Sequence, residues 1–350
     1  MCEHTFVRWQ SQTVEADHDP RLPGFAEDVV VRRFDAPEAL DTRFHEVRTK
    51  SAINRVPNAT KLPFAWTVNP YRGCSHACNF CFARPTHEYL DFNAGRDFEK
   101  EIVVKVNVPE VLRAELKRPS WGGAHIALGT NTDPYQWVEG RYKLMRGIWE
   151  AMRDFANPCS ILTKSPLVLR DTDLLCEIAE RTSVSACLSV PTLDEKAWRA
   201  TEPHTPHPRA RLEAVAELNR LGIPTGILIA PLMPGINDAP EQVERIVALA
   251  TEAGAVHIGG TTLFLRGSVK EVFFEWLREH RPDLLERYDR LYSRGAYLPA
   301  DERRTIEVAA GAPWAERSYP DRFRHRGRRG PGRAASSREE VMPQAQQPLF

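Results

Sequence analysis

Three cysteines on one short stretch are the residues of this sequence best suited to chemistry. Cys74, Cys78 and Cys81 follow one another at Cys-x3-Cys-x2-Cys spacing, directly after a β-like segment at residues 65–68. Thiolates are the usual ligands of iron–sulfur clusters, and three of them hold three corners of a four-iron cluster. The fourth iron then has no protein ligand and stays open to a substrate. The spacing therefore predicts a catalytic [4Fe-4S] cluster with these three cysteines as its metal ligands.

Two other roles of clustered cysteines fit the sequence less well. A structural zinc site takes four protein ligands, commonly from two Cys-x2-Cys or Cys/His pairs. His76 is available as a fourth ligand, but no second pair follows downstream. A disulfide framework is typical of small secreted chains, whereas this chain has 350 residues and no apolar signal-peptide core near its start.

The composition is that of an ordinary globular enzyme, with 42% hydrophobic and 27% charged residues. Lys plus Arg equals Asp plus Glu at 47 each, so the charge of the whole chain does not indicate a nucleic-acid partner. No run approaches the roughly 18 apolar residues that a membrane helix needs. We therefore expect a cytoplasmic protein without a membrane partner.

Strand-like and helix-like segments alternate along most of the chain. The strand-like segments are residues 65–68, 101–106, 125–130, 159–163, 184–190, 225–230 and 256–265. The helix-like segments are residues 109–118, 141–155, 171–181, 209–221, 240–253 and 269–279, and residues 82–92 form a loop with a short helix. Short strands that alternate with helices of about 10 to 16 residues predict an α/β fold with a parallel sheet. In such folds the active site lies at the carboxyl ends of the strands.

The chain divides by composition into three parts. Residues 1–58 are polar and weakly periodic, which predicts an N-terminal extension packed on the main domain. Residues 59–300 carry the strand–helix alternation and form the predicted core. Residues 301–350 form a C-terminal extension that ends in a basic, disordered tail.

The cysteine loop resembles that of the radical S-adenosylmethionine enzymes, which have three cysteines at this spacing with an aromatic residue, here Phe80, before the last. The resemblance implies a partial (βα)6 TIM-like barrel, built from the first six strand–helix units, with the seventh as an addition. It also implies S-adenosylmethionine as cofactor, bound at the open iron by its amino and carboxylate groups. An electron from the cluster cleaves the C5′–S bond in that family and gives a 5′-deoxyadenosyl radical. A flavodoxin or ferredoxin would be the electron donor.

Polar residues at three strand ends are similar to those of the spore photoproduct lyase branch of this family. They lie in residues 128–136, 162–165 and 188–191. The resemblance implies that Lys164 pairs with the methionyl carboxylate and that Ser189 hydrogen-bonds the cofactor. Thr130 and Asn131 would line the methionyl side, and Phe80 is a further cofactor-binding position.

Two arginines on the helix-like segment that begins at residue 209 complete the predicted cofactor site. Arg209 and Arg211 follow the stretch at residues 202–206 and resemble a helix-borne cofactor contact. The alternative is the usual one for an Arg on an amphipathic helix, a solvated side chain.

Motifs at residues 69–74, 84–89 and 129–135 are similar to an uncharacterised, photolyase-like bacterial subgroup of the branch. One position departs from spore photoproduct lyases. They carry a hydrogen-donating cysteine directly before the position matched by Thr130, and this sequence has Gly129 there. The resemblance therefore does not extend to direct reversal of the spore lesion.

The C-terminal tail suggests partners. Residues 317–338 are rich in Arg, Gly, Pro and Ser, and such a basic arm can neutralise phosphates or simply keep the protein in solution. The chain ends in Gln-x-x-Leu-Phe, with Gln346, Leu349 and Phe350, which resembles the peptide by which bacterial repair proteins dock on the sliding clamp.

These observations together predict a radical S-adenosylmethionine enzyme, lyase-like, that acts on nucleic acid, with damaged DNA as the favoured substrate. Two alternatives stay open. The radical chemistry could serve a small molecule, a protein or RNA instead. A non-catalytic adaptor, whose metal loop is structural and whose tail recruits the sliding clamp, is the rival from another class.

Overall fold

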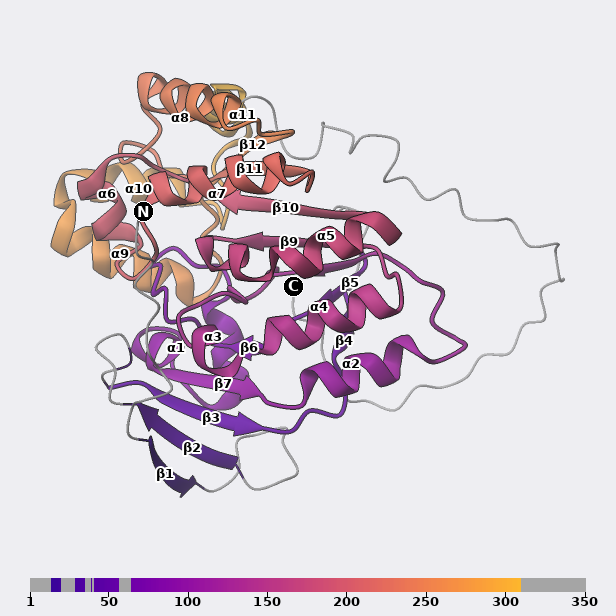
Figure 1. The fold of residues 1–350 in the computed structure, drawn as a ribbon. Helices are drawn as coiled ribbons and strands as arrows, with labels where there is room; N and C mark the ends of the chain where they lie inside the picture. The colour runs from indigo at the N-terminus through magenta and orange to yellow at the C-terminus, as the bar shows by residue number, and fades with distance from the viewer. Residues whose placement is uncertain (1–13, 20–28, 35–38, 40, 57–63, 310–350) are drawn as a thin grey trace, which may run out of the picture.

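The computed structural model describes residues 14–19, 29–34, 39, 41–56 and 64–309 (Figure 1). Its main sheet has seven strands in the order β12-β11-β10-β9-β8-β5-β4. The six strands from β5 to β12 in this sheet pair in parallel, and β4 pairs antiparallel with β5 at the edge. Their bounds are β4 Ile53–Arg55, β5 Trp66–Val68, β8 Ile126–Leu128, β9 Cys159–Thr163, β10 Val184–Ser189, β11 Thr225–Leu232 and β12 Ile258–Thr262. The predicted α/β class is confirmed.

Helices follow the parallel strands and cover the main sheet (Figure 1). They are α2 Val108–Leu116, α4 Leu144–Asp154, α5 Thr172–Arg181, α7 Pro208–Arg220 and α8 Pro240–Glu252. A further helix, α9 Ser268–His280, follows β12 and packs against the segment Arg84–Leu90 instead. Proline stands in the first turn of α2, α7 and α8, where its missing N–H would have had no partner. The close packing of α2 against α4 requires a glycine at position 147, because a Cβ there would lie 2.8 Å from the Cβ of Pro109.

The second predicted barrel strand, residues 101–106, lies in another sheet, so that expectation was wrong. The segment forms β7 (Glu101–Lys105) in a five-stranded sheet of order β1-β2-β3-β7-β6. The other strands are β1 Val14–Asp19, β2 Val29–Phe34, β3 Arg43–Val47 and β6 Tyr71–Arg72. Strand β8 therefore pairs directly with β5, and β12 is the sixth parallel strand rather than an addition. Strand propensity does not say which strand will be the neighbour, and here β3 of the N-terminal extension pairs with β7.

The described part of the N-terminal extension is built into both sheets. Strand β3 lies parallel to β7, and β4 pairs with β5. The extension therefore supports the strand that leads into the cysteine loop.

The structure contains short helices in addition to the predicted alternating strands and helices. The predicted helix at 141–155 is divided into α3 (Glu139–Tyr142) and α4 by Lys143, whose φ of +53° is left-handed. A 3-10 helix, η4, spans Arg84–Leu90 after the cysteine loop. The remaining elements are α1 Arg96–Lys100, η5 Pro166–Asp171, α6 Glu195–Thr201, η6 Pro282–Leu284, α10 Leu285–Leu291 and α11 Ala300–Ala309.

The C-terminal part of the fold packs against the cysteine loop. Phe80 shares an apolar cluster with Leu263 and Leu265, which follow β12, and with Tyr288 and Tyr292 from the α10 region. The predicted basic tail and the clamp-like peptide lie outside the described residues. In the described ranges, no helix has both the length and the apolar character needed to cross a membrane.

Candidate active site at the cysteine loop

The three cysteines lie on one loop that follows β5 and β6 at the carboxyl end of the parallel strands. Cys74 and Cys78 are buried, and Cys81 is partly exposed. Burial raises the pKa of the Cys78 thiol well above its usual range, and the charge of Glu202 adds to this effect. Burial and the charge of Cys74 raise the pKa of Cys81 to about 11. The thiols thus influence one another electrostatically, and each would lose its proton on binding a metal.

The described side chains do not form a preformed site for a single zinc ion. Among the residues with described positions, no three His, Cys, Asp or Glu side chains gather tightly enough to hold one metal ion. A four-iron cluster is larger, so its thiolate ligands stand further apart. His76, the candidate fourth zinc ligand, has its Nδ1 3.4 Å from Asp133 Oδ2. Although burial opposes it, the charges of Cys74 and Asp133 raise the pKa of His76 to about 9, and a protonated imidazole does not bind metal.

Gly73 and Gln136 fix the start of the loop. Gly73 has a φ of +77°, and a Cβ there would lie 2.9 Å from the carbonyl oxygen of Phe98. The Cys74 backbone N–H donates to that same carbonyl over 2.9 Å. The Gln136 side chain accepts from the N–H of Ser75 (2.9 Å) and donates to the carbonyl of Gly73 (3.1 Å).

Arg84 holds the other half of the loop. Its side chain is 1% exposed. The guanidinium donates to the carbonyls of Cys78 (2.9 Å) and Ala77 (3.2 Å), and on its other side to those of Ala94 and Gly95. It also pairs with Glu99. The conformation between Cys74 and Cys81 therefore depends on one buried cation, which explains the arginine at the start of the 84–89 motif.

Three residues predicted from the sequence meet beside the loop. Lys164, directly after β9, has its Nζ 2.8 Å from the Oγ of Ser189 at the end of β10. The same Nζ lies 5.6 Å from the centroid of the Phe80 ring. The charge of Lys164 partly offsets the rise that burial causes in the pKa values of Cys78 and Cys81. Lys164, Ser189 and Phe80 thus form a cationic, partly apolar wall next to the thiols.

Glu202 is a site residue that the sequence reasoning missed. One carboxylate oxygen lies 2.5 Å from Lys164 Nζ, and the other accepts from Arg211 over 2.8 Å. Glu202 is completely buried, and although burial opposes it, the charges of Arg211 and Lys164 lower its pKa. Asn79 of the cysteine loop ties this segment in place, because its N–H and side-chain amide donate to the carbonyls of Thr201 and Ala200 over 3.2 Å each. Glu202 follows a short helix without a periodic signal, so only its contacts identify it.

The two arginines of α7 differ in position. Arg211 is completely buried, and its guanidinium donates to the carbonyls of Pro206 and Ser189 as well as to Glu202. Its donors thus face protein groups behind Lys164, and its direct contact with a cofactor stays a prediction. Arg209 is exposed at the start of the helix, and its cofactor role stays a prediction.

The loop after β8 brings polar groups to the same edge of the sheet. Thr130 is partly buried, and the side-chain oxygen of Asn131 is buried without a hydrogen-bond partner among the described residues. Asp133 accepts from the hydroxyl of Thr163 and from the N–H of Lys164, over 2.7 Å each. The unpaired Asn131 oxygen is an acceptor available for a bound group, as a cofactor site requires.

Gly129 is required by the backbone. Its φ is +75°, and a Cβ there would lie 1.9 Å from the carbonyl oxygen of Leu162. No side chain can be placed in that space without moving β9. The position at which spore photoproduct lyases are expected to carry a cysteine is therefore closed to any cysteine in this fold.

A buried network supports the strand before the loop. The Tyr71 hydroxyl donates to Glu139 over 2.5 Å, and Arg170 joins Glu139 to Asp171. Asp171 in turn accepts from the hydroxyl of Tyr135 over 2.8 Å. These contacts connect β6 to α3 and η5 and hold the base of the site rigid.

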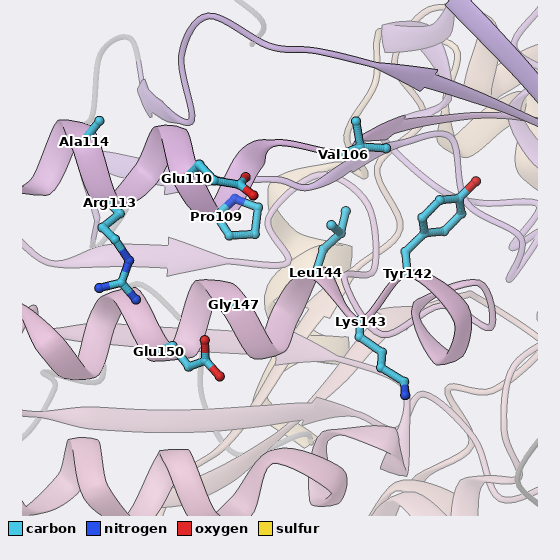
Figure 2. A pocket seen from close by; sticks show the side chains of 10 residues that line it. All are labelled: Val106, Pro109, Glu110, Arg113, Ala114, Tyr142, Lys143, Leu144, Gly147 and Glu150. Carbon is cyan, nitrogen blue, oxygen red and sulfur yellow. The ribbon is translucent and has the colours of Figure 1, made fainter. Parts of the chain in front are cut away.

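A pocket of about 670 Å³ lies elsewhere, between α2 and the α3–α4 region (Figure 2). Glu110 and Arg113 approach it from α2, and Lys143 and Glu150 line its other side. None of its lining residues belongs to the cysteine loop. The cysteine loop is the candidate active site, because the thiols and the Lys164–Glu202 pair lie there and not at this pocket.

Comparison with known proteins finds one matching family model and several relatives. A family model described as the radical SAM superfamily matches residues 68–250. An uncharacterised protein of Mycobacterium tuberculosis is 46% identical over 304 residues, which cover 86% of this chain and 89% of that protein. An uncharacterised protein of Methanocaldococcus jannaschii is 31% identical over 194 residues, 55% of this chain and 69% of that protein.

Among solved structures, a variant of spore photoproduct lyase superposes with a TM-score of 0.54 at 15% identity, covering 76% of each chain. Spore photoproduct lyase complexed with the dinucleoside spore photoproduct gives a TM-score of 0.50 at 13% identity, covering 73% of this chain and 81% of that one. At these identities the likeness is one of fold.

Proposed function

This chain belongs to the radical S-adenosylmethionine superfamily, and from this premise we propose that Cys74, Cys78 and Cys81 bind a [4Fe-4S] cluster that cleaves S-adenosylmethionine reductively. Members of that family are enzymes. The observation that supports the proposal is the convergence of three thiols, two of them buried, with the Lys164–Ser189 contact on one side of the sheet. A structural metal loop would need no ammonium group beside it.

The roles of the residues follow from their chemistry. When bound, the cluster would supply the electron that breaks the C5′–S bond of S-adenosylmethionine, leaving methionine and a 5′-deoxyadenosyl radical. Lys164 offers an ammonium group to the methionyl carboxylate, and Ser189 orients that ammonium. The buried Asn131 oxygen is a suitable acceptor for the methionyl amino group. Phe80 helps to exclude water from the thiols.

Anaerobic reconstitution with iron and sulfide, followed by reduction and addition of S-adenosylmethionine, tests the proposal. We expect wild-type protein to form 5′-deoxyadenosine and Cys78→Ala to form none. Cys187→Ala is the matched control, because Cys187 lies in β10 outside the loop and should leave the product unchanged. If zinc copurifies with the protein, and the iron-reconstituted protein forms no 5′-deoxyadenosine, the non-catalytic adaptor would be favoured instead.

For the substrate we propose nucleic acid, with damaged DNA as the first choice. The Arg-rich segment at 317–338 supports this choice, because it can neutralise phosphates. Spore photoproduct lyase, whose fold is similar, has been solved with a dinucleoside photoproduct. The closed position at Gly129 means that a cysteine at this site cannot donate the hydrogen, so the chemistry on a lesion would differ.

Filter binding across a salt series tests this substrate class. The full-length chain should bind DNA with an affinity that falls as salt rises, and a variant with the arginines of residues 317–338 changed to glutamine should bind less tightly. Absence of DNA binding by both proteins would favour the small-molecule, protein or RNA alternative.

We also propose two protein partners. A flavodoxin or ferredoxin would reduce the cluster, and the sliding clamp would bind the C-terminal peptide through Gln346, Leu349 and Phe350. The purified clamp should bind the full-length protein, and the double change Leu349→Ala with Phe350→Ala should abolish that binding. Equal binding by both forms would rule out the clamp motif.

A further inference from the structure

Two cations lie side by side on one face of the five-stranded sheet. Strand β6 pairs antiparallel with β7 so that Arg72 is opposite Val103. Lys105 follows Val103 by two residues, and its N–H donates to the carbonyl of Pro70 over 3.0 Å. Side chains alternate along a strand, so Arg72, Val103 and Lys105 share a face and the two cations are diagonal neighbours.

Neither cation has an anionic partner among the described residues. The Lys105 side chain is buried, and its Nζ donates to the carbonyl of Asn69 over 3.0 Å. The half-buried Arg72 side chain makes no hydrogen bond or ion pair with a residue that the structure describes. Burial and the charge of Arg72 lower the pKa of Lys105 to about 7.

The carboxylate of Glu101, on the same strand, is already paired with other side chains. Glu101 lies on the same face of β7, four positions before Lys105. It accepts from Arg43 Nε over 2.8 Å and lies 2.7 Å from the ring nitrogen of His45. Two adjacent, shielded positive charges without a counter-charge are costly, and natural folds accept such a cost mainly at functional sites.

We propose that Arg72 and Lys105 bind a phosphate-type oxyanion. A guanidinium presents two parallel N–H donors to a tetrahedral oxyanion, and an ammonium adds a point charge from the side. The anion would supply the missing counter-charge. Its source is either free phosphate or a phosphodiester of nucleic acid. The site is separate from the one around Lys164, and only its nucleic-acid form rests on the proposed function.

The proposed anion site lies next to the segment that carries the three cysteines. Arg72 precedes Cys74 by two residues, and Lys105 binds the backbone of Asn69, which leads into the same loop. A phosphate held by the pair is therefore anchored to the segment that carries the cysteines. A nucleic-acid strand bound there would be fixed close to the predicted reaction centre.

Thermal unfolding of the reconstituted full-length protein tests the site. Inorganic phosphate should raise the Tm of the wild type above its value in chloride of equal ionic strength, because a ligand stabilises the state that binds it. Arg72→Gln and Lys105→Met should lose this shift, whereas Arg96→Gln, an exposed change on α1, should keep it. Without phosphate, Lys105→Met should unfold at the wild-type temperature or above it, because a buried charge has been removed.

Two results would overturn the proposal. One is an equal phosphate shift in all four proteins, and the other is no shift in the wild type. If Arg72→Gln and Lys105→Met instead lost iron with no change in phosphate response, the pair would serve the loop and not an anion. Formation of 5′-deoxyadenosine is measured on the same samples, so failure of the anion site and failure of the radical chemistry are distinguished.

A short oligonucleotide without terminal phosphates identifies the source of the anion. If it raises the Tm of the wild type and of Arg96→Gln but not of Arg72→Gln, the site binds a phosphodiester. If inorganic phosphate alone produces the shift, the site binds free phosphate. If neither inorganic phosphate nor the oligonucleotide raises the Tm of the wild type, the proposal is overturned.

Discussion

The ammonium group of Lys164 lies 2.5 Å from a carboxylate oxygen of Glu202, which is itself completely buried. The other oxygen of Glu202 accepts from Arg211, so this carboxylate is held between two cations. Lys164 is thereby oriented towards Ser189 before any ligand binds. A preorganised cation binds a carboxylate with less loss of conformational freedom than a mobile one.

Glu202→Gln should weaken the binding of S-adenosylmethionine about tenfold, since a charge-assisted contact of Lys164 contributes about 1.5 kcal/mol or more. Equilibrium dialysis of the anaerobically reconstituted protein measures the dissociation constant. Glu195→Gln is the matched control, because Glu195 forms an exposed pair with Arg199 at the start of α6. An unchanged constant for Glu202→Gln would show that Lys164 does not depend on this carboxylate.

Arg211→Met should lower the free energy of unfolding by about 3–5 kcal/mol, because it removes one partner of a buried ion pair. Arg209→Met, two residues earlier on the exposed side of α7, should change it little. Denaturant unfolding of both variants makes the comparison. Similar losses would mean that Arg211 does not stabilise the site from behind.

Arg84→Gln should reduce the iron retained after reconstitution and desalting, because the carbonyls of Ala77 and Cys78 lose their common donor. Iron and sulfide analysis per protein chain gives the readout. Arg96→Gln again serves as the exposed control. Full retention by Arg84→Gln would mean that the loop keeps its shape without the guanidinium.

His87 should make stability depend on pH. Burial lowers its pKa to about 4, while the Glu101 carbonyl accepts from its Nε2 over 2.9 Å. Its pKa in the unfolded chain is about 6.5. Between these values the unfolded chain binds a proton that the folded chain does not, so stability is lost as the pH falls from about 6.5 to 4.

The effect can be isolated with His87→Gln, which keeps an N–H donor. Over that interval the wild type should lose up to about 3 kcal/mol more than the variant in urea unfolding. Parallel pH profiles for the two proteins would show that His87 does not titrate in this way.

Much of the fold was predictable because each strand–helix unit carries a local signal. The limits of β9, α5 and α8 fall within a residue or two of the predicted segments. The partner of β7 was not predictable, because a strand pattern gives orientation of side chains and not the identity of the neighbour. The break at Lys143 was also missed, since a left-handed residue without glycine leaves no clear mark in the sequence.

The candidate site also contains residues that the sequence predicted and residues that only the structure reveals. Spacing alone predicted the three cysteines, and the strand-end resemblance led to Lys164 and Ser189, which the structure brings into contact. Glu202 and Arg84 could not be predicted, because their importance comes from buried contacts with distant parts of the chain. Arg211 was singled out as a cofactor contact, which stays a prediction, and only the structure shows that it is buried against Glu202.

The most direct test of the central claim is electron paramagnetic resonance of the reduced, reconstituted protein with and without S-adenosylmethionine. A [4Fe-4S] cluster on Cys74, Cys78 and Cys81 with an open iron should give a signal that changes on addition of the cofactor. The change should be lost in Lys164→Met, which keeps the cluster and lacks the ammonium group. A signal that does not respond to S-adenosylmethionine in the wild type would contradict the assignment of this loop as the cofactor site.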